Sequence, residues 1–247
     1  GHSNTSVGTY SLDANTTGIT NTAVGKYALS SNTTASSNTA IGNDSLASST
    51  TAAQNTAVGY QALVATTTGS YNVGVGYASL TTNTTGTQNA ALGRNSLNSN
   101  TTGTQNTAVG NHALHSNTTS SNNTAVGYQS LYVSTTGSSN VAVGYQALDA
   151  NTTADNNTAV GTTALGANTE GFSNTGLGKD AGSAITTGDN NTCLGYQAGI
   201  TGSPGGAVTT GNNQLCLGDE NVANAHVQVD WTVASDQRDK TDFTALD

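Results

Sequence analysis

A single repeat unit recurs at a fixed interval along almost the whole chain, and it constrains the fold more than any other feature. The clearest copy begins at Asn55 and reads Asn-Thr-Ala-Val-Gly-Tyr-Gln-Ala-Leu as far as Leu63. Each anchoring asparagine follows the previous one by 17 residues. The anchors are Asn4, Asn21, Asn38, Asn55, Asn72, Asn89, Asn106, Asn123, Asn140, Asn157, Asn174 and Asn191. A thirteenth copy carries Gln214 as its anchor, after a six-residue insertion around 202–206. Such a fixed period is typical of a solenoid, in which each unit contacts mainly its neighbours.

The four residues after each anchor predict a short strand that ends at a glycine. The first of them is mostly Thr, the second is always small, the third is always aliphatic, and the fourth is Gly in all thirteen copies. Alternate residues of a strand point to opposite faces, and Gly lets the backbone turn or approach a neighbour closely. The aliphatic and glycine positions are represented by Val58, Gly59, Val109, Gly110, Val143 and Gly144.

A second short segment follows the glycine and carries Leu in ten of the copies, for example Leu63, Leu114 and Leu148. We expect this Leu to meet the Val of the first strand inside the coil. The small residue on the opposite face of the strand is then expected to approach another chain. The remaining residues, typically Asn-Thr-Thr-Gly, are expected to form an outer turn in which Asn and Gly supply positive φ angles.

Composition and charge exclude several classes of protein. Charged residues make up only 8% of the chain, against about a quarter in typical domains, but the strict period argues against a disordered low-complexity segment. The formal charge is −9, from 14 acidic and 5 basic residues, and no basic stripe supports nucleic-acid binding. No apolar run is long enough to span a membrane. We expect no cofactor and no metal, and a chain that is a fragment of a longer protein.

The thin core of each coil predicts association. Ordering one unit costs on the order of 25 kcal/mol at about 1.5 kcal/mol per residue, whereas one Val and one Leu contribute about 2–3 kcal/mol each. Stacking adds backbone ladders and side-chain columns, but we still expect a second face of the coil to be buried against symmetry mates. The sequence therefore predicts an all-β protein, a β-solenoid or β-roll of thirteen short coils, in an elongated assembly about 60 Å long.

The Asn-Thr-Ala-Val-Gly unit resembles the haemagglutinin-type head repeats of trimeric autotransporter adhesins, which carry Ser-Val-Ala-Ile-Gly-like strands in a trimeric β-roll. The resemblance covers the chain from Asn4 to about Asn221, with a period of 17 in place of the family's shorter unit. Similar repeats occur in long fibres of marine bacteriophages. The resemblance implies a homotrimer.

The end of the chain differs from the array and suggests two further units. Residues 223–235 include an alternating segment around Trp231, expected to be a capping strand or neck after the array of residues 1–222. Residues 236–247 are expected to begin a further domain. Its opening, Ser235-Asp236-Gln237-Arg238-Asp239-Lys240, resembles the start of the intramolecular chaperone domain of phage tail fibres and tailspikes, whose pattern is Ser-Asp-x-Arg-Leu-Lys. The resemblance implies self-cleavage with Ser235 as nucleophile, Asp236 as first released residue and Lys240 as base. Asp239 departs from this pattern, and most of the chaperone domain is not contained in this chain.

These features together predict a structural and adhesive segment of a homotrimeric phage tail fibre, located in the virion. Its expected partners are further copies of itself, other tail or fibre proteins, and a glycan or protein of the host surface. The first alternative is the head of a bacterial trimeric autotransporter adhesin at the cell surface. A second alternative is an ice-binding β-solenoid, suggested by Thr pairs such as Thr101-Thr102.

The remaining candidate groups favour no enzyme. The acids near the last repeats, Asp180, Asp189, Asp219 and Glu220, occupy variable positions and are expected to be solvated. Cys193 and Cys216 lie at the same position of neighbouring repeats, so a disulfide is within reach, although a small buried hydrophobe is the favoured interpretation. His112 and His115 are interpreted as surface variation. The Asn-Thr-Thr triplets match the N-glycosylation pattern but are attributed to turn chemistry.

Overall fold

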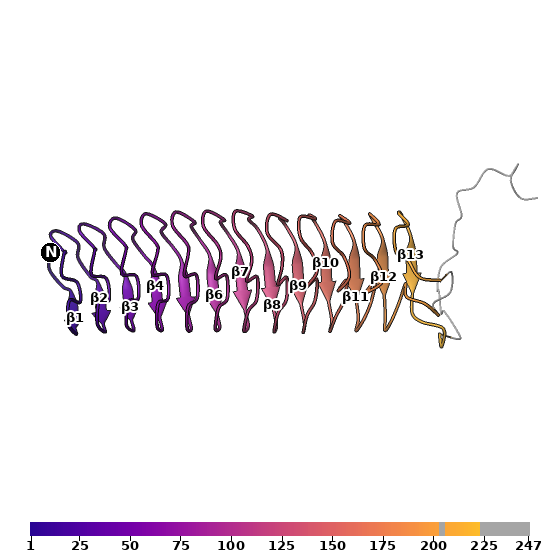
Figure 1. Cartoon of the computed structure of the whole chain (residues 1–247), viewed down its shortest axis with the longest axis horizontal. Helices are drawn as coiled ribbons and strands as arrows, with labels where there is room; N and C mark the ends of the chain where they lie inside the picture. Colours follow the sequence, from indigo (N-terminus) through magenta and orange to yellow (C-terminus); the bar gives the residue numbers. More distant parts are fainter. Residues whose placement is uncertain (203–205, 223–247) are drawn as a thin grey trace, which may run out of the picture.

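The computed structural model describes residues 1–202 and 206–222, which wind as a β-solenoid with one parallel sheet along its length (Figure 1). The strands are β1 (Thr5–Val7), β2 (Thr22–Val24), β3 (Thr39–Ile41), β4 (Thr56–Val58), β5 (Val73–Val75), β6 (Ala90–Leu92), β7 (Thr107–Val109), β8 (Thr124–Val126), β9 (Val141–Val143), β10 (Thr158–Val160), β11 (Thr175–Leu177), β12 (Thr192–Leu194) and β13 (Leu215–Leu217). No helix occurs among the described residues. The neck of residues 223–235 and the segment 236–247, with Ser235, Asp236 and Lys240, lie outside them.

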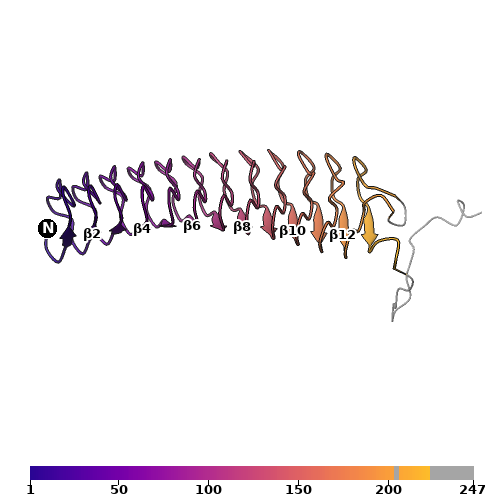
Figure 2. The same cartoon turned by 60° about the horizontal axis from the view of Figure 1, so that its bottom comes forward.

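The repeat period is the pitch of the solenoid. Each strand pairs in parallel with the next one in the sequence, at equivalent positions such as Ala57 and Gly74 in β4 and β5. Eleven of the twelve strand-to-strand steps equal the sequence period, and the last, from Thr192 to Leu215, is longer by the six-residue insertion. The predicted parallel array of short strands is therefore confirmed. Seen from a second direction, the strands line one side of the solenoid and the loops the other (Figure 2).

The second segment of each coil is a series of turns, not a strand. Its backbone is nonetheless bonded from coil to coil: the N–H of Leu63 donates to the carbonyl of Ser79 at 2.9 Å, and the N–H of Gln61 donates to that of Asn43 at 3.0 Å. Leu63 has φ 55°, a left-handed conformation that is uncommon for Leu. Hydrogen bonds to the coil on either side hold the backbone in this conformation.

The interior of the coil is built from Ala and Leu, so the predicted assignment of the two strand faces was wrong. Ala57 and Leu63 are completely buried, whereas Val58 is half-buried and points outward. The same reversal holds at the other two representative strands, where Val109 and Val143 are half-buried beside fully buried alanines. The physical reason is space, because a Cβ placed on Gly74 would already lie 3.2 Å from Cγ of Leu63. Nothing larger than a methyl group fits opposite the Leu.

The invariant glycine acts as the predicted hinge. Gly59 has φ 135°, a region that side chains disfavour, and a Cβ there would collide with the carbonyl oxygen of Gly76 in the next coil. Gly110 and Gly144 repeat this conformation, with φ 136° and 141°. Both reasons for a glycine, the turn and the close approach of backbones, therefore apply.

Buried asparagines form two hydrogen-bonded ladders through the interior. The anchor Asn106 donates from Nδ2 to the carbonyl of Ser120 at 2.8 Å and accepts from the N–H of Asn123 at 3.0 Å. The turn residue Asn100 donates to Oδ1 of Asn83 at 2.8 Å. The positive φ angles predicted for these turn asparagines do not occur, and several of the glycosylation triplets have a buried carboxamide. Their role is to satisfy buried backbone groups.

The last coils have a different core. Where earlier coils carry Leu at the eighth position after the anchor, these carry Gly182 and Gly199. Cys193 and Cys216 replace the buried Ala, pair with each other in the register of β12 and β13, and are buried free thiols. Cys thus occupies the place of a small hydrophobe, as favoured from the sequence.

Candidate functional site

The outward face of the sheet, formed by the first and third residues after each anchor, is called the sheet face here. Every one of its positions in β1 to β13 is Thr, Val, Ile, Leu or Ala, and none is charged. Seven of its thirteen third positions are exposed and the other six are half-buried; Ile41, Leu92 and Leu177 are accessible to 40%, 41% and 40%. The face is therefore an uncharged, largely aliphatic strip.

The sheet face runs the full length of the array. Thirteen strands spaced about 4.8 Å apart make a strip about 60 Å long. Figure 2 shows the strands side by side along it, without a described segment lying over them. Proteins that stay monomeric rarely expose apolar strips of this extent, so the sheet face is a candidate interface.

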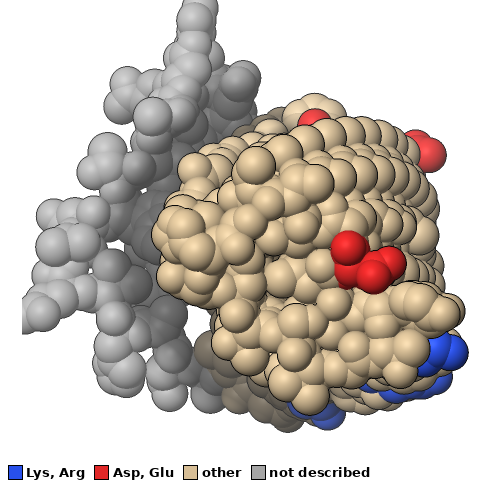
Figure 3. All heavy atoms as spheres, turned by 90° about the vertical axis from the view of Figure 1, so that its left-hand side faces the viewer, with Lys and Arg blue, Asp and Glu red and all other residues tan. Residues whose placement is uncertain are grey.

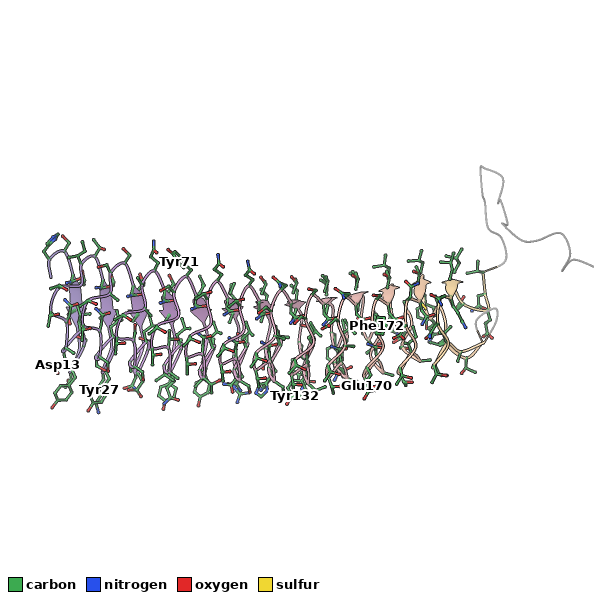
Figure 4. All side chains as sticks on the ribbon, turned by 90° about the horizontal axis from the view of Figure 1, so that it is seen from above. Asp13, Tyr27, Tyr71, Tyr132, Glu170 and Phe172 are labelled. Atoms are coloured by element: carbon green, nitrogen blue, oxygen red, sulfur yellow. The ribbon has the colours of Figure 1, made fainter. Side chains whose placement is uncertain are left out.

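Exposed aromatic side chains occur both near the sheet and on the opposite side of the solenoid. Figure 4 places Tyr71 at the edge that carries the sheet, and Tyr27 and Tyr132 on the side away from it. Tyr71 stands at a position that is polar in every other coil, whereas the position of Phe172 also holds Ile19 and Ala53. Tyr71 and Phe172 have exposed fractions of 58% and 52%. The aromatic residues on the far side, in contrast, touch one another from coil to coil.

The largest of these contacting groups is called the aromatic ridge here, and it consists of Tyr60, Tyr77, Arg94, His112, His115 and Tyr132. The rings of Tyr60 and Tyr77 stack with centroids 5.3 Å apart and planes within 18°, and the guanidinium of Arg94 lies 5.9 Å from the Tyr77 centroid. His112 and His115 have centroids 5.3 Å apart, and His115 is 5.3 Å from Tyr132.

Asn95 joins the two halves of the ridge, because its Nδ2 lies 3.1 Å from Nε2 of His112. The ridge therefore extends over five consecutive coils, from Tyr60 to Tyr132. Two separate stacked pairs, Tyr10–Tyr27 and Tyr128–Tyr145, continue the pattern along the solenoid.

All Lys and Arg side chains among residues 1–202 and 206–222 stand at one position, the fifth after the anchor, and each lies over a tyrosine ring. They are Lys26, Arg94 and Lys179. Seen along the solenoid axis, these basic groups gather at one edge, apart from the acidic atoms (Figure 3). Lys179 has an acidic neighbour, Asp180, at 3.6 Å, in the one ion pair found within the described part of the chain.

The two imidazoles of the ridge favour their neutral form. Burial lowers the pKa of His112, with a further contribution from the charge of Arg94. Burial also lowers the pKa of His115, and His112 adds to the effect. At neutral pH the ridge therefore carries one formal positive charge, on Arg94. The interpretation of the histidines as surface variation missed this cluster. Two features of the sequence point to it: His112 and His115 are three residues apart, and they lie in the repeat that follows the repeat of Arg94.

The acids near the last repeats make local hydrogen bonds. Asp180 accepts from the hydroxyl of Thr163, and Asp189 accepts from the N–H of Phe172 at 3.0 Å. Hydrogen bonds from Asn221 lower the pKa of Asp219, while Glu220 is exposed. Elsewhere, burial raises the pKa of Asp149. Within the described residues, no group of three or more His, Cys, Asp or Glu could hold a metal ion.

The Thr pairs of the outer turn use half of their hydroxyl groups inside the protein. Thr101 donates from Oγ1 to the carbonyl of Thr118 at 3.0 Å, and the first Thr of most other pairs does the same toward the next coil. The second Thr, such as Thr102, is exposed, whereas the first is half-buried in every coil except those of Thr16 and Thr209. The pairs therefore serve coil stacking, which weakens the argument for a two-column ice-binding surface.

No protein-family model matches the chain, and neither a curated protein nor a solved structure is similar enough to count as a match. Among the described residues, no helix is long and apolar enough to cross a membrane.

Proposed function

We propose that this chain is a structural and adhesive segment of a homotrimeric phage tail fibre, in which three parallel copies bury their sheet faces against one another. The observation that supports this proposal is the uncharged, half-exposed aliphatic strip along all thirteen strands. An identical copy in register offers the same pitch and the same residue at every height. The buried strip supplies the apolar burial that the thin Ala and Leu core lacks.

The trimer would act as a rigid shaft in the virion. Each coil is hydrogen-bonded to the next around its whole circumference, so bending would break many bonds at once. The shaft would carry or present a region that binds a host glycan or protein, and it would join other tail proteins. The same sheet face would serve the head of a bacterial trimeric autotransporter adhesin. Immunogold labelling of purified virions and of bacterial surfaces distinguishes the two, since the tail-fibre proposal requires label on the virion tail.

Sedimentation equilibrium tests the assembly. The chain has a mass of 24.5 kDa, and a particle of three times this mass is the expected species at micromolar concentration. A monomer would overturn the proposed assembly, and a dimer would overturn its threefold form.

A matched pair of variants locates the interface. Val109→Glu places a carboxylate on the sheet face, and burying it against two others is costly, so the trimer is expected to dissociate. Thr102→Glu places the same group in the exposed outer turn, where Glu170 already stands in another coil, and it should remain trimeric. A trimer of unchanged stability in Val109→Glu would remove the sheet face from the interface.

A further inference from the structure

The aromatic ridge lies in a long stretch of chain without acidic residues. Between Asp44 and Asp149 the sequence contains no Asp or Glu, and Arg94 is its only Lys or Arg. Arg94 stands in the sixth coil, three coils from each of those two acids, which corresponds to about 14 Å along the axis. This distance exceeds the screening length of about 8 Å at physiological salt. Among residues 1–202 and 206–222, the guanidinium therefore has no acidic partner.

Arg94 is also held in place. Its side chain is exposed but lies over the ring of Tyr77, whose other side is stacked on Tyr60. A guanidinium that rests on an aromatic ring loses less freedom on binding a carboxylate than a free side chain does. The neighbouring Asn95 and the imidazoles of His112 and His115 add neutral hydrogen-bonding groups beside it.

We propose that the aromatic ridge binds an acidic saccharide, with the guanidinium of Arg94 paired to a sugar carboxylate and the flanking rings and amides against the sugar's C–H faces and hydroxyls. This inference rests on the proposed function, since it names the class of host-surface ligand that the fibre would meet. Because Figure 4 places Tyr132 on the side away from the strands, the ridge would stay accessible in a trimer that buries its sheet faces.

The composition of the ridge favours a saccharide over other anions. Nucleic acids and polyphosphates are bound through many cations, and the ridge has one in a chain of net charge −9. A purely apolar partner would leave the guanidinium, the phenols and the imidazoles without hydrogen bonds. A uronic-acid type of sugar carries one carboxylate per ring among hydroxyls and apolar C–H groups, which matches this mixture.

Calorimetric titration of the complete chain with trigalacturonate tests the proposal, with the methyl ester of the same trisaccharide as the uncharged ligand. Arg94→Asn is the main variant, because Asn43 and Asn111 already stand at this position in other coils. Lys179→Asn removes the same charge at the same position outside the ridge. Tyr77→Thr removes the supporting ring, and Thr9 and Thr162 show that the position accepts Thr.

We expect trigalacturonate to bind the wild-type protein. The substitution Arg94→Asn and the use of the methyl ester should each weaken binding by about tenfold. Tyr77→Thr should weaken binding less, and Lys179→Asn should leave it unchanged. The proposal is overturned if trigalacturonate does not bind, if Lys179→Asn weakens it as much as Arg94→Asn, or if the ester binds equally well. Sedimentation of the same samples separates the two proposals. A trimer that does not bind refutes the ligand alone, and a monomer that binds refutes the assembly alone.

Discussion

The regular coils and the last coils solve the same packing problem with different residues. In the regular coils the interior holds Leu at the eighth position after the anchor and a buried polar residue, usually Asn, at the eleventh. In the last coils Gly182 and Gly199 replace the Leu, while Ile185 and Val208 become the buried residues at the equivalent of the eleventh. The apolar bulk has moved three residues along the coil.

The cysteines complete this exchange. A Cβ placed on Gly199 would lie 2.7 Å from Sγ of Cys193 and 3.5 Å from Sγ of Cys216. The space that Leu fills in the regular coils is thus taken up by sulfur atoms from the adjacent strands. Each coil therefore keeps a similar interior volume, and the residues that supply this volume change together.

The largest effects are expected from removing that volume in either region. Leu114→Ala in the regular array and Ile185→Ala in the last coils should each lower the free energy of unfolding by about 3 kcal/mol, because both side chains are fully buried and leave a cavity. Urea unfolding at one fixed protein concentration measures both. If Ile185→Ala proves neutral while Leu114→Ala is costly, the last coils do not share the packing rule.

Restoring Leu to the last coils should be harmful by itself. Gly199→Leu is expected to cost about 2 kcal/mol through overpacking against Cys193. Its φ of 75° is not the obstacle, since Leu114 adopts φ 51° at the same position. Adding Cys193→Ala, Cys216→Ala and Val208→Asn recreates the regular pattern and should recover most of the loss. A combined variant no more stable than Gly199→Leu alone would contradict volume exchange.

A smaller effect should appear at alkaline pH in the last coils alone. Burial, with a contribution from Cys216, raises the pKa of Cys193 from 9.0 to about 12. The folded state therefore keeps its proton where the unfolded chain loses it, so stability is complete below about pH 9 and falls as pH rises toward 12. Relative to Cys193→Ala, the wild type should lose about 1 kcal/mol by pH 10. Thermal unfolding of both proteins at pH 8 and pH 10 measures this; parallel shifts would argue against a buried thiol.

The sequence predicted the backbone better than the packing. The period of the anchors fixed the register of all thirteen strands, and the invariant glycine located the hinge, because both depend on local geometry that repeats. The prediction of which strand face points inward was wrong. Hydrophobicity favours Val58 in the interior, but the small space beside the Leu accommodates only the side chain of Ala57. A coil one Leu wide leaves room for the smaller residue only.

Two further features depend on contacts between coils and could not be read from a single repeat. The carboxamide of the anchor Asn106 is buried because it donates to Oδ1 of Asn89 in the coil before at 3.2 Å and accepts from the N–H of Asn123 in the coil after at 3.0 Å. In a sequence, Asn usually suggests an exposed turn instead. The aromatic ridge depends on residues at three different positions, which the winding brings together. Its signals, the lone Arg94 and the absence of acids around it, become meaningful once the coils are stacked.

Thiol labelling measures directly whether the sheet face is buried in the assembly. Leu92 on the sheet face and Tyr128 on the loop side are 41% and 44% exposed in the single chain, so Leu92→Cys and Tyr128→Cys would react with a maleimide at similar rates in a monomer. The wild type, whose two thiols are buried, gives the blank, and denatured samples give the full rate. We predict rapid labelling of Tyr128→Cys and protection of Leu92→Cys by at least about tenfold. Equal rates at the two positions in the folded protein would contradict the account.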